Sequence, residues 1–498
     1  MKNRIKNIIL IIFIFTLYNC TDEYFDVNTP SGAATEDQLR MADLIGPSTF
    51  NTFIAQYWAE RSLGNYSQYI TGQGGGAIGQ ASLPSTWSTI YLGAFPDLNV
   101  IIRKAEEKNA THFKAVANIL IAVNLGLLTD SWDNVPYSEA TQFEGNLKPA
   151  FDSQQDIYLE IDSLLDSAIS ALNSPDNSGF SIKNDMIYNG DKDQWLRAAY
   201  TLKARYQMHL IERNGAAAAT AALASLANGF ISNSDDFEMS YPGDIQNPWY
   251  LREIKARNTG NNHDKIGDQF VNYMNGNIYA LPTVGIDPRL PEIAVRLDAV
   301  APDVASAGID PWRGFLSGGD GSSSDGGNGN ANFAVDGFYT NSKSPITIIT
   351  YAEAQFLKAE AEFIVAGGNT TSVGSNANAY TAYMAGIQAN MAKLSVSGGG
   401  YMAEPSIDVG MANLMLHHIM KEKYIANFLN PETFVDFRRY DFSPDVFKDL
   451  ALPVDNADSE FPGEWLVRAQ YPSSEAIRNP INVNANKKTP TTKVWWDQ

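Results

Sequence analysis

Few residues of this chain have the types and spacing that catalysis, cofactor binding or metal binding requires. Residues 74–79, GGGAIG, match G-x-G-x-x-G, but a dinucleotide site needs a strand before this pattern and a helix after it, and Pro84 follows here. His417 and His418 are neighbours, so on a helix they point about 100° apart and cannot share a metal through i, i+4 geometry. We therefore predict no catalytic residues, no cofactor and no metal-binding residues from these patterns.

The single cysteine, Cys20, stands directly behind an apolar segment at the N-terminus. Three basic residues come first, and the apolar run of residues 8–17 follows. Ten helical residues span about 15 Å, roughly half of a bilayer's hydrocarbon core, so the run suits a secretory signal and not a membrane span. With Leu17 three positions before it, Cys20 resembles the lipid-modified cysteine of a bacterial lipoprotein. Residues 1–19 would then be a lipoprotein signal peptide, and a reduced cysteine near an ordinary cleavage site is the alternative.

The charge balance excludes some partners. The 498 residues carry a formal net charge of −20, and removal of the basic signal segment makes the chain more acidic still. Nucleic acid is excluded because its phosphates require clusters of Lys and Arg. The same balance argues against binding to anionic lipid through the protein surface. With one cysteine no intramolecular disulfide can form, so stability has to come from packing.

Apolar residues recur at helical spacing in two blocks that bracket an irregular region. The periodicity predicts helices at residues 111–127, 153–172, 193–213, 215–227, 350–368, 377–394 and 411–429. Between the blocks, residues 229–344 are rich in Pro, Gly, Asn and Asp and lose periodicity. A chain of this length exceeds a single core of about 250–300 residues. We expect two lobes, or one helical scaffold with a large insertion.

Five segments resemble motifs of the SusD/RagB family, the outer-membrane nutrient-binding lipoproteins of Bacteroidetes-type bacteria. They are LLTDSWDNVPYSEA (127–140), YNGDKDQWLRAAYTLKARY (188–206), ITYAEAQFLKAEAEF (349–363), IMKEKYIANFLNPETFVDFRRY (419–440) and RAQYPSSEAIRNP (468–480). They occur in the family's order and span nearly the whole chain behind Cys20. Asp133 stands where the family's turn usually has glycine, and Asn134 stands where it usually has an acid. These two departures leave the geometry of that turn open.

The resemblance implies a mainly α fold, in which tetratricopeptide-like helix pairs form a SusD-like α-α superhelix with a loop-rich insertion. We expect one SusD-like domain at 20–498, with scaffold at about 40–228 and 345–440, the insertion at about 229–344 and a loop-rich tail at 441–498. The chain itself shows no clean 34-residue repeat.

The resemblance also implies a function and a place. The protein would be lipid-anchored in the outer membrane and exposed on the cell surface, where it captures an oligomeric nutrient. It would deliver this ligand, expected to be an oligosaccharide, to a SusC-type TonB-dependent transporter. Asp22, Glu23 and Asp26 resemble the export signal of such surface lipoproteins. The resemblance implies no catalysis, so we expect that the chain is not an enzyme. A surface lipoprotein hydrolase is one alternative, because the many acidic residues include possible glycosidase pairs. A lid for a peptide ligand and a passive scaffold or adhesin are the others.

Aromatic residues of irregular segments are the candidates for ligand binding. Trp249 and Tyr250 lie in QNPWY, Trp312 lies in DPWRGF, and Tyr66 and Tyr69 precede the glycine-rich loop. Flat aromatic rings suit the apolar face of a sugar, and loops on a rigid scaffold usually carry binding sites. These aromatics could instead only pin the loops down.

Other conspicuous side chains are expected to serve the scaffold. Trp195 lies on the apolar stripe of the predicted helix at 193–213, which predicts a core residue. Trp58 shares a further predicted helix with Phe50, Ile54 and Arg61, and we expect it in the core as well. Arg438 and Arg439 follow Asp436, and we expect these arginines to make buried pairs with carboxylates and not to bind a ligand.

Replacing Cys20 by alanine should release the protein from the outer membrane, because a lipoprotein's acyl chains supply its stable anchoring. Fractionation of cells that express C20A or the unaltered chain measures this directly. Recovery of C20A in the outer membrane at the unaltered level would show that the anchor lies elsewhere. Protease added to intact cells should degrade the unaltered chain, whereas protection would mean that it faces the periplasm.

Overall fold

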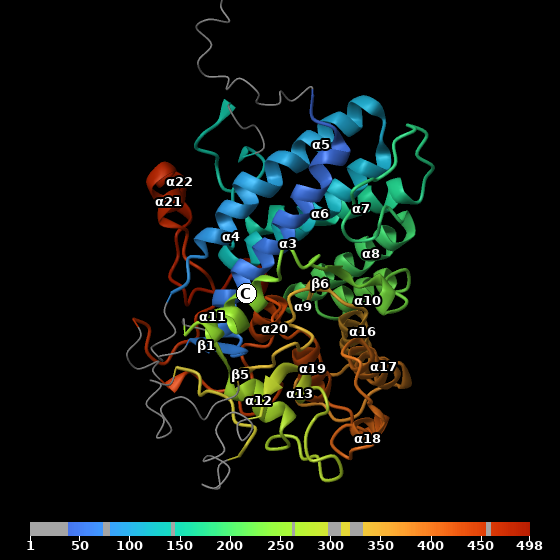
Figure 1. Ribbon diagram of the computed structural model, residues 1–498, viewed down its shortest axis with the longest axis vertical. Coiled ribbons are helices and arrows are strands. Elements are labelled where there is room, and N and C mark those ends of the chain that lie inside the picture. The colour runs from blue at the N-terminus through green and yellow to red at the C-terminus, as the bar shows by residue number, and fades with distance from the viewer. Residues whose placement is uncertain are drawn as a thin grey trace, which may run out of the picture. The chain divides into compact units, whose positions relative to one another are not determined.

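The computed structural model describes residues 38–72, 80–140, 145–260, 264–296, 310–318, 332–454 and 460–498. Residues Met41–Gln498 form one compact unit, apart from Met1–Arg40. The unit is mainly helical, which confirms the predicted fold class (Figure 1). The predicted signal peptide, Cys20 and nearly all of the glycine-rich loop at 72–79 lie outside the described residues.

The first helical block packs around one apolar helix. Its helices are α3 (Met41–Tyr66), α4 (Pro84–Thr89), α5 (Phe95–Lys108), α6 (Thr111–Trp132), α7 (Gln154–Leu172), α8 (Lys192–His209), α9 (Ile211–Asn214) and α10 (Ala216–Leu226), with the π-helix η2 (Ile90–Ala94) before α5. α6 packs on α5 and α7, and α8 packs on α7 and α10. α6 is long and apolar enough to cross a membrane, but 83% of its most apolar window is buried in the protein. It is therefore the central core helix of this block.

The second block continues the layer of paired helices. Its main helices are α16 (Tyr351–Val365), α17 (Ala377–Lys393), α18 (Gly399–Met402), α19 (Leu416–Ala426) and α20 (Glu432–Arg439). α16 packs on α10 of the first block and on α17 and α19 of its own, so the two blocks share one continuous core (Figure 1). Thr350 caps α16 through its hydroxyl, which accepts a hydrogen bond from the backbone N–H of Glu353. The tail ends in α21 (Ser473–Arg478) and α22 (Pro480–Asn486).

Short antiparallel strand pairs tie the irregular region to the helices. β2 (Phe237–Met239) pairs with β6 (Ile346–Ile349), so the two ends of the region lie together. β1 (Ile70–Gly72), which follows α3, pairs with β3 (Asp264–Ile266) inside the region, and β4 (Ala294–Val295) pairs with β5 (Asn332–Phe333). The region also contains the π-helix η5 (Tyr250–Lys255), α11 (Ala256–Asn258), α12 (Asp268–Met274) and α13 (Leu290–Ile293). This region thus holds several short elements that the lost periodicity did not reveal.

The turn after α6 explains one departure from the family motif. Asp133 has a φ of 77°, a left-handed conformation that favours glycine. Its carboxylate compensates, because Oδ2 accepts a bond of 2.9 Å from Arg468 and Oδ1 accepts one of 2.9 Å from the backbone N–H of Trp495. Asn134 also bonds, and its Oδ1 accepts from the backbone N–H of Gln154 at 3.0 Å. The turn therefore keeps the glycine-like geometry and gains two links to the C-terminal tail.

The close approach of α16 and α17 depends on a glycine. A Cβ at Gly386 would lie 2.6 Å from Cε1 of Phe356, which is fully buried. Gly386→Ala should therefore overpack this contact and lower the free energy of unfolding by about 1–3 kcal/mol. Gly399→Ala is the matched control, because a Cβ there meets nothing within 4 Å. Equal denaturant midpoints for the two variants would contradict this packing.

Candidate ligand-binding site

The segments that carry the predicted aromatic residues converge at the C-terminal end of α3. Tyr66 ends this helix, Tyr69 precedes β1, and β1 pairs with β3. Asp264 of β3 accepts bonds of 2.8 and 3.0 Å from the guanidinium of Arg252, so η5 is fixed to the same place. Sequence positions some 200 residues apart are thus brought together.

The structure divides the predicted aromatic side chains between core and surface, and it buries both tyrosines at the end of α3. Tyr69 is 0% exposed, its hydroxyl donates to the carbonyl of Tyr424 at 2.6 Å, and the two rings stack at 4.5 Å. Tyr66 is 5% exposed, and its hydroxyl accepts a bond of 2.7 Å from the backbone N–H of Ala81. Both rings pack inside the protein and offer no face to a ligand in this structure.

Trp249 is also buried, at 3% exposure, with its ring edge-to-face against Tyr57 at 4.9 Å. It lines a cavity of about 20 Å³ together with Tyr339, Lys393 and Phe428. This volume is enough for one water molecule and far too small for a sugar ring. Trp249 therefore holds η5 against α3.

Tyr250 and Trp312 remain as the half-exposed members of the predicted set. Tyr250 opens η5, and its backbone N–H donates to Oδ1 of Asn247 at 3.1 Å. The backbone of Trp312 is held by Asp310 and Asn275, which bond its N–H at 2.8 Å and its carbonyl at 2.9 Å. No ring contact joins Tyr250 and Trp312 in the described part of the chain. Their roles in ligand binding stay predictions.

One further aromatic residue lies at the surface where the sequence predicted core. Trp58 is half-exposed, and its ring lies 5.0 Å from that of Tyr57 on the same helix. The guanidinium of Arg61 lies over it, 5.3 Å from the ring centroid. The missed signal is the i, i+3 spacing of Trp and Arg, which places both on one helix face. We call Trp58, Arg61, Tyr250 and Arg252 the α3–η5 surface, because Trp249 packs η5 onto α3 beside them.

Arg61 is a positive group without a counter-ion among the described residues. Its Nε is buried and meets no acceptor, and its guanidinium lies over the faces of Trp58 and Tyr57. Burial raises the pKa of Tyr57 to about 12, although Arg61 and Arg252 oppose the shift, so the phenol stays neutral. A half-exposed indole beside an unpaired guanidinium can stack on a sugar ring and donate hydrogen bonds to its oxygens.

Two carboxyl groups lie under this surface but are already engaged. Glu253 is 0% exposed, and its Oε2 accepts a bond of 2.8 Å from the backbone N–H of Asp264. Burial raises the pKa of Glu253 well above its usual range. Asp264 is 5% exposed and is held by Arg252. Both carboxyl groups are buried and bonded to protein groups, so in this structure they do not form an exposed acid–base pair.

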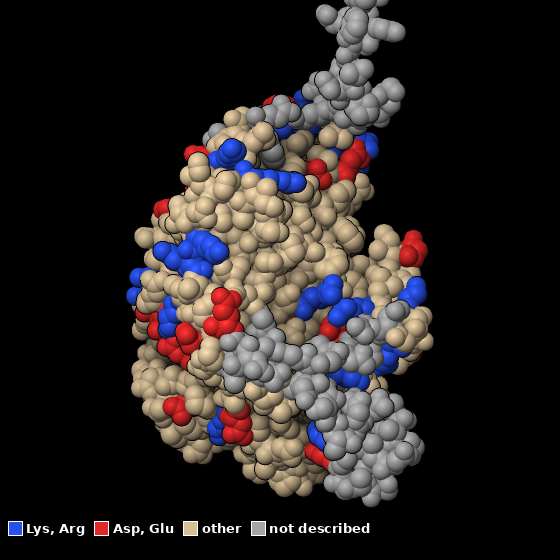
Figure 2. Space-filling model, turned by 90° about the vertical axis from the view of Figure 1, so that its left-hand side faces the viewer, with Lys and Arg blue, Asp and Glu red and all other residues tan. Residues whose placement is uncertain are grey.

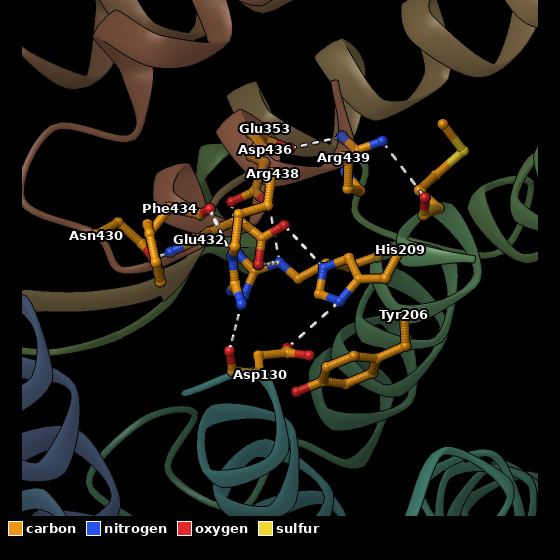
Figure 3. Close-up of polar contacts among 12 residues, drawn as sticks. Asp130, Tyr206, His209, Glu353, Asn430, Glu432, Phe434, Asp436, Arg438 and Arg439 are labelled. Carbon is orange, nitrogen blue, oxygen red and sulfur yellow. Dashed lines mark hydrogen bonds and ion pairs between the residues drawn. The ribbon is translucent and has the colours of Figure 1, made fainter. Parts of the chain in front are cut away.

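A second set of charged residues forms a buried network between the two blocks (Figure 3). Arg205 of α8 donates two bonds to Glu353 of α16, of 2.8 and 2.6 Å. His209 lies between the carboxylates of Glu432, at 2.9 Å, and Asp130, at 3.4 Å. These side chains come from the four helices α6, α8, α16 and α20, and all of them are buried.

The two arginines at the end of α20 belong to this network in different ways. Arg439 pairs with Glu360 at 2.7 Å and with Asp436 at 2.5 Å, as the sequence predicted. Arg438 departs from the prediction, because its guanidinium donates to the carbonyls of Asp130 and Val467 at 2.7 and 3.0 Å. Burial lowers the pKa of Arg438 to about 10.

The cavity beside this network has a volume of about 30 Å³, lined among others by Asp130, Arg205 and Glu432. It can hold a water molecule but no sugar. Within the described residues no three His, Cys, Asp or Glu side chains gather as metal ligands. The network is therefore a structural feature, and the α3–η5 surface is the candidate ligand-binding site.

The chain matches one protein family and several solved structures. The family model is described as SusD-like, starch-binding and associating with the outer membrane, and it matches residues 8–472. A chitin-binding protein is 25% identical, with a TM-score of 0.73 over 92% of this chain and 100% of that one. A chitin-binding SusD homolog from Flavobacterium johnsoniae is 20% identical, with a TM-score of 0.71 over 92% and 98% of the two chains.

A SusD homolog from Bacteroides uniformis has the same fold, with 19% identity and a TM-score of 0.71 over 92% of this chain and 99% of that one. Among curated proteins, none is detectably similar in sequence to this chain. The family match covers nearly the whole chain, so the chain belongs to the SusD-like family. The resemblance seen in the five sequence motifs is thereby confirmed.

The charge on His209 gives the network a pH dependence. Burial disfavours the imidazolium, but the carboxylates of Glu432 and Asp130 outweigh it and raise the pKa of His209 from 6.5 to about 9. The folded-state pKa is higher than the unfolded one, so this stabilisation is fully present below about pH 6.5 and is lost as pH rises through 9. The free energy of unfolding should fall by about 3 kcal/mol more in the unaltered chain than in His209→Gln across this window. Parallel pH profiles of the two proteins in urea unfolding would refute the assignment.

Proposed function

We propose that this chain is a lipid-anchored surface protein that binds an oligosaccharide and delivers it to a SusC-type TonB-dependent transporter. The observation that carries the binding role is the α3–η5 surface, where Trp58 is half-exposed beside the unpaired Arg61. Tyr250 adds a second half-exposed ring on η5. A rigid helix and a short fixed π-helix hold these groups, so little side-chain order has to be gained on binding.

The similar structures and the family description indicate which ligands to test first. Two of the similar structures are described as chitin-binding, and the family description refers to starch. Both polymers present flat sugar faces and many hydroxyl groups, which suit an aromatic ring and a guanidinium. We propose chito-oligosaccharides as the first ligands, with malto-oligosaccharides second.

The anchor and the transporter are inferred from the family and from the sequence. Cys20 lies outside the described residues, and its lipidation rests on the apolar run before it. The family description, association with the outer membrane, supports this location. Extraction of the tagged chain in mild detergent during growth on the glycan should recover a large outer-membrane barrel, whereas repeated recovery of the chain alone would contradict the delivery role.

A hydrolytic role is the second class of function. Glu253 and Asp264, the acid pair under the candidate surface, are buried and already bond to protein groups, so we assign them no catalytic role. Incubation with chito-oligosaccharides should therefore leave their chain length unchanged. The appearance of shorter products would make the chain a hydrolase and overturn the binding role.

Removing either half-exposed ring should weaken binding. Trp58→Ala and Tyr250→Ala should each raise the Kd for a chito-oligosaccharide about tenfold or more, because each variant removes a stacking surface. Trp312→Ala tests the remaining predicted residue in the same titration. Phe180→Ala is the matched control, since Phe180 is 48% exposed and lies between α7 and α8.

Titration calorimetry measures the affinities, and a thermal melt shows that each variant is folded. Binding that is unchanged in Trp58→Ala and Tyr250→Ala, with folding intact, would remove the α3–η5 surface as the site. No heat with any oligosaccharide but a signal with oligopeptides would favour the peptide alternative.

A further inference from the structure

Four aliphatic side chains outside the α3–η5 surface are highly exposed. Of the large hydrophobic residues in the described ranges, the four most exposed are Leu147 at 83%, Ile477 and Ile481 at 79%, and Leu92 at 72%. Such residues are common singly on protein surfaces, but a cluster marks a contact site.

Hydrogen bonds and ring contacts place the segments that carry these residues side by side. Asn479, between α21 and α22, and Asn482 of α22 both donate to the carbonyl of Pro149, at 2.8 and 3.0 Å, so the two helices lie beside Leu147. The ring of Trp87 contacts those of Tyr91 and Tyr471, at 4.6 and 6.2 Å, so the segment that carries Leu92 lies beside the start of α21. The two helices form an outlying pair in Figure 1, on the side that faces the viewer in Figure 2. We call Leu92, Leu147, Ile477 and Ile481 the apolar edge.

Basic side chains surround the apolar edge in an otherwise acidic protein. Residues 473–488 contain one acid, Glu475, which is half-buried. The exposed basic residues here are Lys148, Arg478, Lys487 and Lys488. Residues 145–150 and 473–488 together contain four basic residues and one acid, so these segments are positive whereas the whole chain has a net charge of −20. Glu139 is a second acid beside them, where it accepts a bond from the backbone N–H of Ala150.

The composition of the edge distinguishes two kinds of partner. Protein interfaces are enriched in aromatic residues, Met and Arg and depleted in Lys. This edge has the reverse, namely bare Ile and Leu side chains with three lysines and one arginine. Aliphatic side chains flanked by long basic ones match the boundary of a bilayer, where the apolar groups enter the acyl region and the basic groups reach phosphates.

We propose that the apolar edge is a membrane contact that binds a lipid surface with anionic, phosphate-bearing head groups. Ile477, Ile481 and Leu147 enter the acyl boundary, while Lys487 and Lys488 bind lipid phosphates. The negative net charge of the chain argued against such a contact. At physiological salt, however, charges more than about 8 Å from the lipid surface are largely screened, so the charge of the edge itself decides the interaction. The contact orients the protein on the membrane independently of its lipid anchor.

Vesicle sedimentation tests this contact without the anchor. The probe is the chain without residues 1–20, because Met41–Gln498 form a compact unit by themselves. It is mixed with vesicles of phosphatidylcholine alone or with added phosphatidylglycerol. Ile477→Ser with Ile481→Ser removes two apolar side chains, and Lys487→Gln with Lys488→Gln removes two charges. Ile231→Ser with Val373→Ser is the matched control, since these residues are 68% and 65% exposed elsewhere.

The unaltered chain and the control should bind the anionic vesicles, and each edge variant should bind about tenfold more weakly. Added salt should weaken the binding, and neutral vesicles should bind less. No vesicle binding, or equal binding by the edge variants and the control, would overturn the proposal. If the edge variants bind vesicles as well as the unaltered chain does but no longer co-purify with an outer-membrane barrel from cells, the edge contacts a protein partner instead. Thermal melts show that all variants are folded.

Discussion

The buried guanidinium–carboxylate pairs at and beside the junction of the two helical blocks are the interactions on which the rest of the structure depends. Arg205 of α8 joins the two blocks by donating to Glu353 of α16. Arg439 of α20 donates to Glu360, about two turns further along α16, and so joins two helices of the second block. Breaking such a pair leaves an uncompensated buried charge, which costs about 3–5 kcal/mol. The blocks are therefore locked in one relative position, and a chain with one cysteine needs no disulfide to achieve it.

This fixed scaffold allows short irregular segments to carry a defined surface. The β2–β6 pair closes the irregular region at its base, and the β1–β3 pair returns it to the end of α3. Trp249, packed on Tyr57, then sets the position of η5, while Arg252 and Asp264 clamp it from the other side. Trp58, Arg61 and Tyr250 are thus pre-positioned by buried contacts. The buried aromatics serve the site indirectly by holding the exposed ones.

Local patterns predicted the helical scaffold because helix periodicity is a local property. The predicted helix at 153–172 coincides with α7, and the pairing of Arg439 with nearby carboxylates was foreseeable from Asp436. Burial of single aromatics was not foreseeable. Tyr69 stacks on Tyr424, 355 residues away in sequence, and no local signal records such a contact. Trp58 was predicted to lie in the core because its neighbours on α3 are apolar. The sequence of a helix does not show which of its faces other elements leave uncovered, so this prediction missed the exposure of Trp58.

The central claim is that the α3–η5 surface binds an oligosaccharide without cleaving it. A crystal structure of the chain soaked with a chito-oligosaccharide tests this most directly. We expect an intact sugar chain with one ring against Trp58 and with sugar oxygens within hydrogen-bond distance of Arg61. The buried ion pairs of Arg205 and Arg439 should stay in place. A sugar bound on another face, or a cleaved sugar beside a carboxylate pair, would contradict it.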